Sequence, residues 1–321
     1  MKIPQYDLDN LGGEYVLTTE LENTIAMFLG VKHCVMVSSG TSAIFIALRS
    51  IGAKNVAIPN LTMVGTAMAA ELAGCNITLV SDSGHIPKNI DTYLHVSLNG
   101  RHCGIDNVLK HKDNILIVED ACQSFGSKHG DKFLGTFGNV GCLSFSPHKI
   151  LSAGNGGCVV TNDDNIALQA RRLKNFGRES GGSDFHEHIG YNFKFTDIQA
   201  RFVLDQFPEL EKKLTRKKEI YLRYLSKLKN IMRGHSGTPW FVDIYVKDRD
   251  ALSLYLKENG IGIRTMYPLI SDQPPFSETK VDGSGLEFKK YSDEGLWLPS
   301  STSITDEEID YVINTIQNWM E

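Results

Sequence analysis

Short runs of β-branched and aromatic residues alternate with helical segments through the first half of this chain, and this alternation restricts its possible folds most. A strand candidate at 34–38 (CVMVS) leads through a Ser-Gly-Thr turn into the apolar helical segment TSAIFIALRS. Further strand candidates follow at 56–58, 77–80, 93–98, 115–119, 140–146 and 157–161. Strands separated by helices are typical of crossover connections, so the pattern predicts an α/β fold with a mostly parallel sheet flanked by helices.

A second, smaller domain is predicted after about Asp205, where a long charged helical segment begins (FPELEKKLTRKKEIYLRYLSKLKN). Its basic residues are expected to form a solvated face. A strand in WFVDIYV, a helix through DALSLYLKENG, the segment IGIRTMY and a last helix capped by Thr305 and Glu308 complete an α+β domain. We expect residues 1–204 to form the large domain and residues 205–321 the connector and small domain, with the N-terminal segment able to pack on the latter.

Composition and charge exclude several classes of function. The chain has 321 residues, of which 41% are hydrophobic, so it can bury a sizeable core. Its net charge is −5 and its basic residues are scattered, which argues against a nucleic-acid partner. No apolar run of signal-peptide length begins the sequence, and no stretch reaches the roughly 18 apolar residues needed to span a bilayer. We expect a cytoplasmic protein with no membrane partner.

Cysteine and histidine spacing gives no metal-binding motif. The six cysteines contain no C-x-x-C pair and are expected to be plain buried thiols in a reducing compartment. His186 and His188 flank Glu187 in a Gly-rich region, but no further ligand stands at the spacing of a metal site. A solvated or substrate-facing loop is the simpler interpretation of this segment, and no metal is expected.

Two stretches of the large domain combine polar residues with a strand end. Ser38-Ser39-Gly40-Thr41-Ser42 lies where a strand runs into a helix, so its N–H groups and hydroxyls could bind an anion, or could simply cap the helix. In ILIVEDACQSFG an apolar strand ends in Glu119 and Asp120. Ligands of open α/β sheets bind at such ends, although an acidic residue there also caps the next helix.

A third stretch, FSPHKILSAGNGG, places Lys149 after a strand and before a loop with three glycines. One lysine in such a position could be a surface charge, but the glycines allow the backbone to approach a ligand closely. Taken together, the three stretches supply a phosphate anchor, a carboxylate for a pyridinium nitrogen and a reactive amine. These are the parts that pyridoxal 5'-phosphate requires. A dinucleotide site is not indicated, because GNGG has no G-x-G-x-x-G spacing.

Four ordered motifs resemble one family. SSGTSA, VEDACQSFGS, GCLSFSPHKILSAGNGGCVVTND and GYNFKFTDIQA are similar to the successive signatures of the DegT/DnrJ/EryC1/StrS sugar aminotransferases, and the resemblance covers nearly the whole chain. It implies fold type I of the pyridoxal-phosphate enzymes and a homodimer with composite active sites. It also implies transamination of a nucleotide-linked keto sugar, with L-glutamate as donor and pyridoxamine 5'-phosphate as the intermediate form of the cofactor.

The resemblance also assigns roles to single residues. Lys149 matches the lysine that holds the cofactor covalently and moves protons, Asp120 the carboxylate that faces the pyridine nitrogen, and Gln123 the neighbour of the phenolic oxygen. Phosphate-binding positions are matched by Gly40, Thr41 and Ser144, and by Asn192 from the partner subunit. Contacts to the substrate diphosphate are matched by Arg178 and Lys194.

Two features depart from the family pattern. Met63 stands where the family usually has an aromatic residue stacked on the cofactor ring, and a thioether can also cover a π face. The segments at 81–91 and around 230–240 are shorter than the family pattern. The two shortened segments concern substrate choice more than chemistry.

Our hypothesis from the sequence is a pyridoxal-phosphate aminotransferase that converts a nucleotide-linked 4-keto-6-deoxyhexose to the 4-amino sugar, of the perosamine or viosamine type, in polysaccharide or O-antigen biosynthesis. The alternatives are a 3-amino sugar aminotransferase, a pyridoxal-phosphate-dependent sugar dehydratase and a non-catalytic sensor that binds the cofactor. Lys149 argues against the dehydratase, to which the resemblance assigns a histidine at that position. Intact Lys149, Asp120 and Gln123 weaken the sensor hypothesis.

Overall fold

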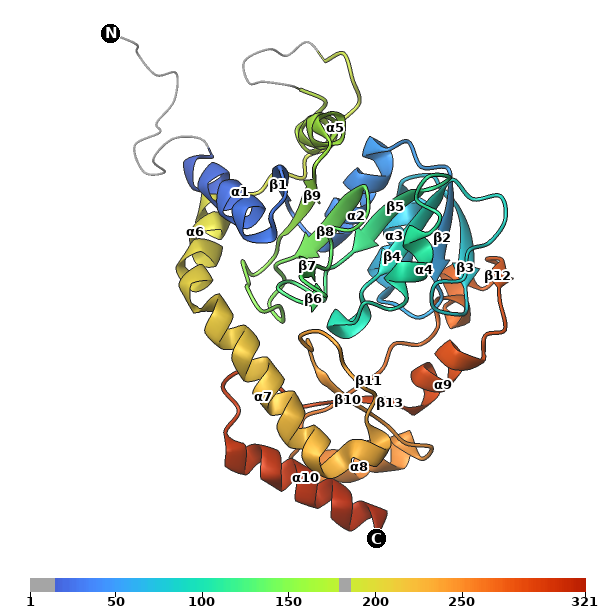
Figure 1. The fold of residues 1–321 in the computed structure, drawn as a ribbon, viewed down its shortest axis with the longest axis vertical. Helices are drawn as coiled ribbons and strands as arrows, with labels where there is room; N and C mark the ends of the chain where they lie inside the picture. Colours follow the sequence, from blue (N-terminus) through green and yellow to red (C-terminus); the bar gives the residue numbers. More distant parts are fainter. Residues whose placement is uncertain (1–14, 179–185) are drawn as a thin grey trace.

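The computed structural model of the protein describes residues 15–178 and 186–321. Its main feature is an eight-stranded sheet in the upper part of Figure 1. In spatial order the strands are β1 (His33–Val37), β9 (Gly157–Thr161), β8 (Val140–Ser144), β5 (Leu116–Asp120), β4 (Thr92–Val96), β2 (Asn55–Pro59), β3 (Asn76–Val80) and β12 (Val281–Asp282).

Strand direction in this sheet is parallel with one exception. In the spatial order just given, every neighbouring pair from β8 through β5, β4, β2 and β3 to β12 is parallel. β9 is antiparallel to both of its neighbours, β8 and β1. β9 is reversed because it returns directly after β8 through the loop that carries Lys149, without a crossover helix. The prediction of a mostly parallel α/β sheet is confirmed.

Alternation along the strands divides the large-sheet core into two faces. In β1, Val35 and Val37 point into the cluster under α2 (Gly40–Ser50), α3 (Val64–Leu72) and α5 (Asp164–Lys174). Cys34 and Met36 point to the opposite face, which α1 (Val16–Leu29) and α6 (Asp197–Gln206) cover. A third helix on that face, α4 (Ile105–Leu109), packs over Tyr93. Because both faces are covered by helices, the strands are apolar on both sides.

The smaller unit is built on a three-stranded antiparallel sheet, β10 (Val242–Tyr245), β13 (Gly295–Leu298) and β11 (Arg264–Thr265). Leu296 and Leu298 pack against α8 (Arg249–Glu258), α10 (Asp306–Met320) and the end of α7 (Leu210–Leu228). Trp297, between them, points to the opposite side and joins a cluster that includes Leu61 of the large unit. The predicted capping box of Thr305 and Glu308 begins α10.

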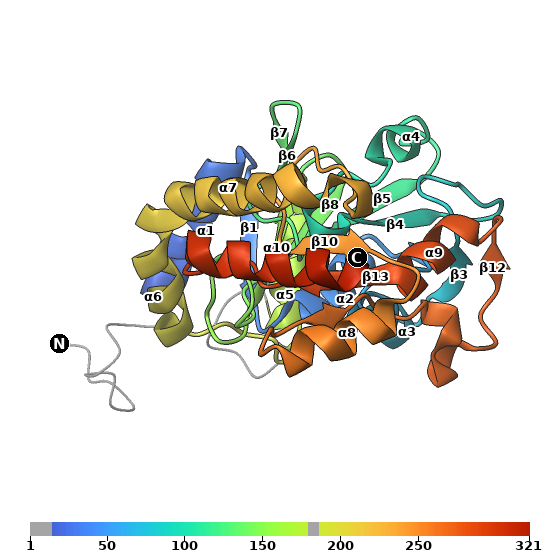
Figure 2. The same ribbon diagram turned by 90° about the horizontal axis from the view of Figure 1, so that it is seen from below.

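The long helix α7 connects the two units, and Figure 2 shows it running beside α10. We propose that the domain boundary lies in the α6–α7 region. One element, β12 (Val281–Asp282), crosses this division. In the sequence, β12 lies between α8 and α9 (Leu286–Glu294) of the small unit. In space, it pairs with β3 at the edge of the large sheet. α1 packs against β1 and α6, so this described part of the N-terminal segment lies on the large sheet and not on the small unit.

Hydrogen bonds from one turn after β4 join the two units. Asn99, whose φ of 55° is left-handed, donates from Nδ2 to the Phe241 carbonyl and accepts from the Phe241 N–H, at 2.9 and 2.7 Å. Arg101 donates to both carboxylate oxygens of Asp243 at 2.8 and 2.7 Å. Both partners of this ion pair are buried, so their charges are screened little by solvent.

All six cysteines are free, four of them buried and Cys103 and Cys122 half-buried. Among the described helices, none combines the length and apolar character that a membrane crossing requires.

The Arg101–Asp243 pair generates the first prediction. Arg101→Met should lower the free energy of unfolding by about 3–5 kcal/mol, because it leaves a buried carboxylate without its partner. Burial by itself would raise the pKa of Asp243, but Arg101 and Tyr245 outweigh it and hold this pKa below its usual value. The stabilisation is therefore present above pH of about 4 and is lost as pH falls further.

Denaturant titration of the wild type and of Arg101→Met tests this prediction. Arg201→Met is a matched control, because Arg201 pairs with Asp205 on an exposed helix face and should contribute little. Replacing both buried partners (Arg101→Met with Asp243→Leu) should cost less than the single change. Equal effects of Arg101→Met and Arg201→Met would show that the buried pair does not hold the units together.

Candidate active site

The Lys149 loop returns the chain from β8 to β9. Its first turn is closed by the Lys149 N–H donating to the Ser146 carbonyl at 3.0 Å, and the Ala153 N–H donates back to the Phe145 carbonyl at 2.9 Å. At Gly156 an added Cβ would lie 2.6 Å from the Phe195 ring, so the close approach of this loop to the core requires glycine. The loop holds Lys149 at the carboxyl end of β8.

The Lys149 side chain is half-buried, and its amine is largely shielded from solvent. Burial lowers its pKa from 10.5 to about 8, a shift that the nearby positive charge of Arg264 reinforces and that Cys122 and Asp120 oppose. No hydrogen bond from its Nζ is found among the described residues. A lysine with this pKa has a substantial neutral fraction near pH 8, and the neutral amine is the nucleophile.

The face of Trp240 covers this amine, with Lys149 Nζ 3.5 Å from the ring centroid. Both the ring and the backbone of Trp240 are hydrogen-bonded. The indole Nε1 donates to the His148 carbonyl at 2.7 Å, and the backbone carbonyl of Trp240 accepts from Lys217 Nζ at 2.7 Å. The ring shields one side of Lys149, and its negative face attracts the protonated form of the amine.

Lys217 corrects the expectation that the basic residues of α7 are all solvated. It is buried, and its Nζ donates to the Trp240 and Ser300 carbonyls at 2.7 and 2.6 Å. Burial lowers its pKa to about 8 as well. The α7 sequence has the charge pattern of a surface helix, so only the packing of the small unit against α7 distinguishes Lys217 from its neighbours.

Asp120 lies at the end of β5, buried and held by two hydrogen bonds. Thr66 Oγ1 donates to one carboxylate oxygen at 2.7 Å, and the Cys122 N–H donates to the other at 3.1 Å. The adjacent Glu119 points the other way, where it accepts from the backbone N–H groups of the 135–138 turn. The two acidic side chains therefore lie on opposite sides of the strand. Glu119 stabilises the 135–138 turn, and Asp120 lies on the side of Lys149.

Three of the predicted phosphate-binding residues, Gly40, Thr41 and Ser144, lie together at the start of α2. Ser39 caps this helix, and an added Cβ at Gly40 would lie 2.7 Å from Cys122 Sγ and 3.0 Å from Ser144 Cβ. Thr41 Oγ1 lies beside Gly65, 2.9 Å from an added Cβ there. Backbone N–H groups at a helix start, next to two hydroxyls, form a site that suits a phosphate group. The residues present thus fit pyridoxal phosphate.

Gln123 is held between the two units. Its Oε1 accepts from the Asn99 N–H at 2.9 Å, and its Nε2 lies 3.4 Å from the Tyr267 hydroxyl. Gln123, Ser144, Lys149 and Trp240 line one small cavity. These contacts place Gln123 beside the Lys149 loop.

Met63 is 45% exposed and caps α3, where its Sδ accepts from the Gly65 N–H at 2.8 Å. An added Cβ at Gly65 would meet both Met63 Sδ and Thr41 Oγ1 within 2.9 Å. Met63 therefore lies next to the start of α2, and its contact with the cofactor ring stays a prediction.

Asn192, Arg178 and Lys194 lie away from Lys149. Arg178 and Lys194 line a separate cavity of about 190 Å³ with Phe195 and residues of α1 and α5, and Lys194 Nζ is 4.0 Å from the Phe176 ring centroid. Asn192 is exposed and pairs with Asn175. Within one chain these three residues therefore lie outside the group formed by Lys149, Asp120 and Gln123.

The two segments that are shorter than the family pattern meet in space. Ser83, from the first, lies with Arg233 and His235, from the second, around a cavity of about 360 Å³ that Arg101 and His102 also line. The two shortened segments are about 150 residues apart in the sequence, but they line the same cavity.

Sequence reasoning missed Trp240 and Lys217, which lie beside Lys149, and Thr66, which donates to Asp120. Trp240 belongs to a segment with the pattern of an ordinary strand, and Thr66 belongs to a segment with the pattern of a helix. The only signal was the unusual run Thr-Pro-Trp before β10, which places a large aromatic residue at a rigid turn.

The chain matches known proteins over nearly its full length. A model of the DegT/DnrJ/EryC1/StrS aminotransferase family matches residues 10–317. GDP-perosamine synthase of Escherichia coli O157:H7 is 27% identical, over 96% of this chain and 90% of that protein. UDP-2-acetamido-2-deoxy-3-oxo-D-glucuronate aminotransferase of Pseudomonas aeruginosa is 29% identical, over 84% and 82%. The solved structure of S. venezuelae DesV superposes with a TM-score of 0.88 at 26% identity, over 95% and 89% of the two chains.

The contact between Trp240 and Lys149 generates the second prediction. In the apoprotein, the rate of pyridoxal phosphate capture should rise with pH and reach half of its maximum near pH 8, because the neutral amine attacks. Trp240→Ala should admit water and move this midpoint to higher pH, because burial is the largest cause of the lowered pKa of Lys149 and should outweigh the attraction of the ring face for the protonated amine. Trp240→Phe should move it less. The midpoint is read from absorbance traces of capture at each pH.

Trp319→Ala serves as the control, because Trp319 packs in the distant cluster of α7, α8 and α10. An unchanged midpoint in Trp240→Ala would show that the indole does not set the pKa of Lys149.

Proposed function

The chain belongs to the DegT/DnrJ/EryC1/StrS aminotransferase family, and from this premise we propose that it aminates C4 of a nucleotide-linked 4-keto-6-deoxyhexose with L-glutamate as donor. Members of this family are pyridoxal-phosphate-dependent sugar aminotransferases, and the chain is an enzyme of this type. The proposal specifies the sugar position, the donor and the residues that act.

The observation that carries the proposal is the largely shielded amine of Lys149 at the carboxyl end of β8. Its lowered pKa suits an amine that must bond to a carbonyl carbon and later carry a proton. In our proposal Lys149 holds the cofactor at rest. After release, its neutral amine moves a proton to or from the substrate carbon that bears the nitrogen.

Asp120 and the start of α2 hold the two ends of the cofactor in this proposal. When bound, pyridoxal phosphate supplies the electron sink that the reaction needs. Asp120 is oriented by Thr66 and by the Cys122 N–H, and its carboxylate favours a protonated pyridine nitrogen. Gly40, Thr41 and Ser144 would hold the phosphate, and Gln123, which lies beside the Lys149 loop, would meet the phenolic oxygen.

Substrate recognition in this proposal uses cations on two sides of the site. Arg264 is exposed and near enough to lower the pKa of Lys149, so it is placed to meet a carboxylate of glutamate. Arg178 and Lys194 line a common cavity and are proposed to meet the diphosphate of the nucleotide sugar bound to the neighbouring subunit.

The position of the new amine has two candidates. The similarity to GDP-perosamine synthase supports amination at C4, giving a sugar of the perosamine or viosamine type. The similarity to an aminotransferase whose name specifies a 3-oxo sugar favours C3 as the second candidate. A panel of 4-keto and 3-keto nucleotide sugars, with NMR analysis of the product, distinguishes the two.

The third prediction concerns Lys149. Glutamate alone should convert the holoenzyme to its pyridoxamine form, with loss of the visible absorbance of the lysine-bound cofactor. In Lys149→Ala this half-reaction should slow by about 10³-fold or more, because nucleophile and proton carrier are both removed. Stopped-flow absorbance measures both rates. Cofactor should still bind to the variant through the phosphate site and Asp120.

Lys227→Ala, on the exposed face of α7, is the matched lysine control. Near wild-type amine transfer in Lys149→Ala would refute the mechanism. A wild-type protein that reacts with no amino donor would favour the sensor, and one that reacts with glutamate but releases no amino sugar would favour the dehydratase.

The fourth prediction concerns the proposed homodimer. If Asn192 reaches the phosphate site of the neighbouring subunit, Asn192→Ala should weaken cofactor binding, and Lys149→Ala should be inactive. Unfolding and refolding the two variants together should then restore about one quarter of the wild-type activity, since half of the dimers are mixed and each has one intact site. Activity at limiting cofactor is the measurement.

Refolding each variant alone is the control. No recovery in the mixture, together with a dimer by light scattering, would place Asn192 in the site of its own subunit. A monomer with full activity would exclude the composite site.

A further inference from the structure

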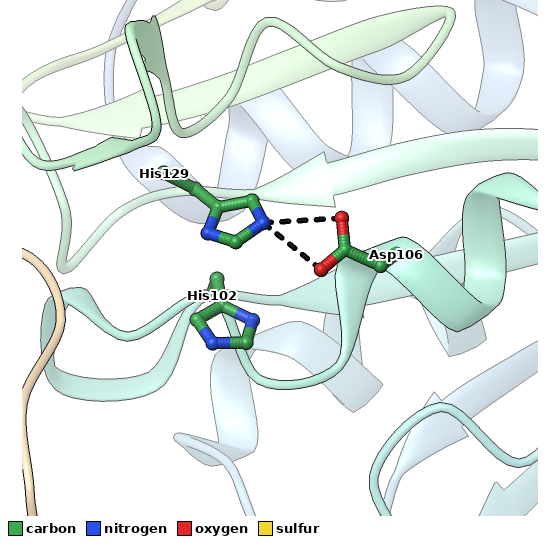
Figure 3. A group of neighbouring side chains, drawn as sticks. All are labelled: His102, Asp106 and His129. Atoms are coloured by element: carbon green, nitrogen blue, oxygen red, sulfur yellow. Dashed lines mark hydrogen bonds and ion pairs between the residues drawn. The ribbon is translucent and has the colours of Figure 1, made fainter.

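A cluster of metal-ligating side chains lies outside the Lys149 site. One ligand atom from each of His102, Asp106 and His129 lies within 4.8 Å of the others. Figure 3 shows the two imidazole rings side by side, with the Asp106 carboxylate next to them. His129 Nε2 is 2.9 and 3.1 Å from the two carboxylate oxygens, and the ring centroids of the histidines are 4.3 Å apart at 22°.

The three residues come from two segments that the fold joins. His102 precedes α4 and Asp106 is in its first turn, whereas His129 belongs to β6 (Lys128–His129) of a hairpin with β7 (Lys132–Phe133). Left-handed backbone at Cys103 and Gly104 makes the turn between His102 and α4. Next to the cluster, Ser127 Oγ donates to the Gly100 carbonyl at 2.7 Å. The cluster therefore rests on backbone that is already fixed.

One atom of the cluster lacks a partner in the described part of the chain. His102 Nδ1 is buried from solvent and makes no hydrogen bond. A buried nitrogen without a partner is unfavourable and uncommon in folded proteins. A lone pair of this kind, next to a second imidazole and a carboxylate, points to a ligand that accepts electron pairs.

We propose that His102, Asp106 and His129 bind a divalent transition-metal ion of the Zn²⁺ or Co²⁺ type. Two imidazole nitrogens and one carboxylate oxygen are a donor set for these ions, whereas Mg²⁺ and Ca²⁺ prefer oxygen ligands. Ligands about 2.1 Å from a tetrahedral ion lie roughly 3.4 Å apart, so modest side-chain rotations from the observed positions suffice. The ion replaces the bond between His129 and Asp106 and leaves a fourth position for water.

The consequence is a cross-link between α4 and the β6–β7 hairpin. Both segments adjoin backbone that contacts the small unit: Ser127 Oγ accepts from the Thr238 N–H at 2.8 Å, and Arg101 precedes His102 and bonds to Asp243. Metal binding should therefore stabilise the fold where the two units meet. It has no role in amine transfer, so it stands independently of the proposed function.

Two other histidines allow an internal comparison. His33 and His85 each lie 2.6 Å from a carboxylate oxygen, of Asp164 and Asp282 respectively, and neither belongs to a three-ligand cluster among the described residues. A histidine–aspartate pair alone offers two ligands, which is a weak site. His33 is therefore the matched control for His129.

The experiment titrates Co²⁺ into tag-free holoenzyme and follows its d–d absorbance, with Zn²⁺ measured by calorimetry and by the thermal unfolding midpoint. Wild type should bind one ion per chain, and Zn²⁺ should raise the midpoint, whereas Mg²⁺ should not. His102→Gln and His129→Gln should each weaken Co²⁺ binding by at least about tenfold and abolish the Zn²⁺-dependent rise. His33→Gln should bind as the wild type does.

Asp106→Asn gives a second route to the same test, because it keeps the shape of the side chain and removes the charge. Circular dichroism of each variant without metal reports whether the fold is kept. Wild type without a stoichiometric site, or equal binding by wild type, His102→Gln and His129→Gln, would overturn the proposal. Equal losses in His33→Gln and His129→Gln would overturn it as well.

Discussion

The segment 238–243 of the small unit must pack against the large unit, because the geometry around Lys149 depends on this contact. Asn99 bonds to Phe241 in both directions, Ser127 accepts from the Thr238 N–H, and Arg101 pairs with Asp243. Trp240 is the only member of this stretch whose ring reaches the Lys149 amine among the described contacts. Without these bonds the amine would be open to water, and burial, the main cause of its lowered pKa, would be lost.

Lys149 and Lys217 both contact Trp240, and desolvation has a different consequence for each of them. Burial lowers the pKa of Lys149 and of Lys217 to about 8. Lys217 donates to two backbone carbonyls, so its amine is held as a structural donor that fixes the Trp240 backbone. Lys149 has a ring face and no such acceptors in the described chain. Its amine is left available for chemistry, which is why we assign the reactive role to Lys149 alone.

Much of the large unit could be predicted from local pattern, and the misses have identifiable causes. The strands and α2 were expected from runs of apolar residues, and the α10 cap from Thr305 and Glu308. The β6–β7 hairpin and β12 have only two residues per strand, too few for a periodic signal. The proposed metal site was not predicted from residue spacing, because His129 comes close to His102 and Asp106 only when the β6–β7 hairpin is folded.

The α/β class and the family could be inferred from the amino-acid sequence alone, because strand periodicity and the motifs around Asp120 and Lys149 are local. Three features could be seen only in the folded chain. Lys217 is buried, the Trp240 ring lies over Lys149, and Glu119 binds the 135–138 turn whereas Asp120 faces the Lys149 side. These outcomes depend on which groups the folded chain brings together and which it shields from water. Desolvation and hydrogen bonding act through space, so no window of the sequence contains them.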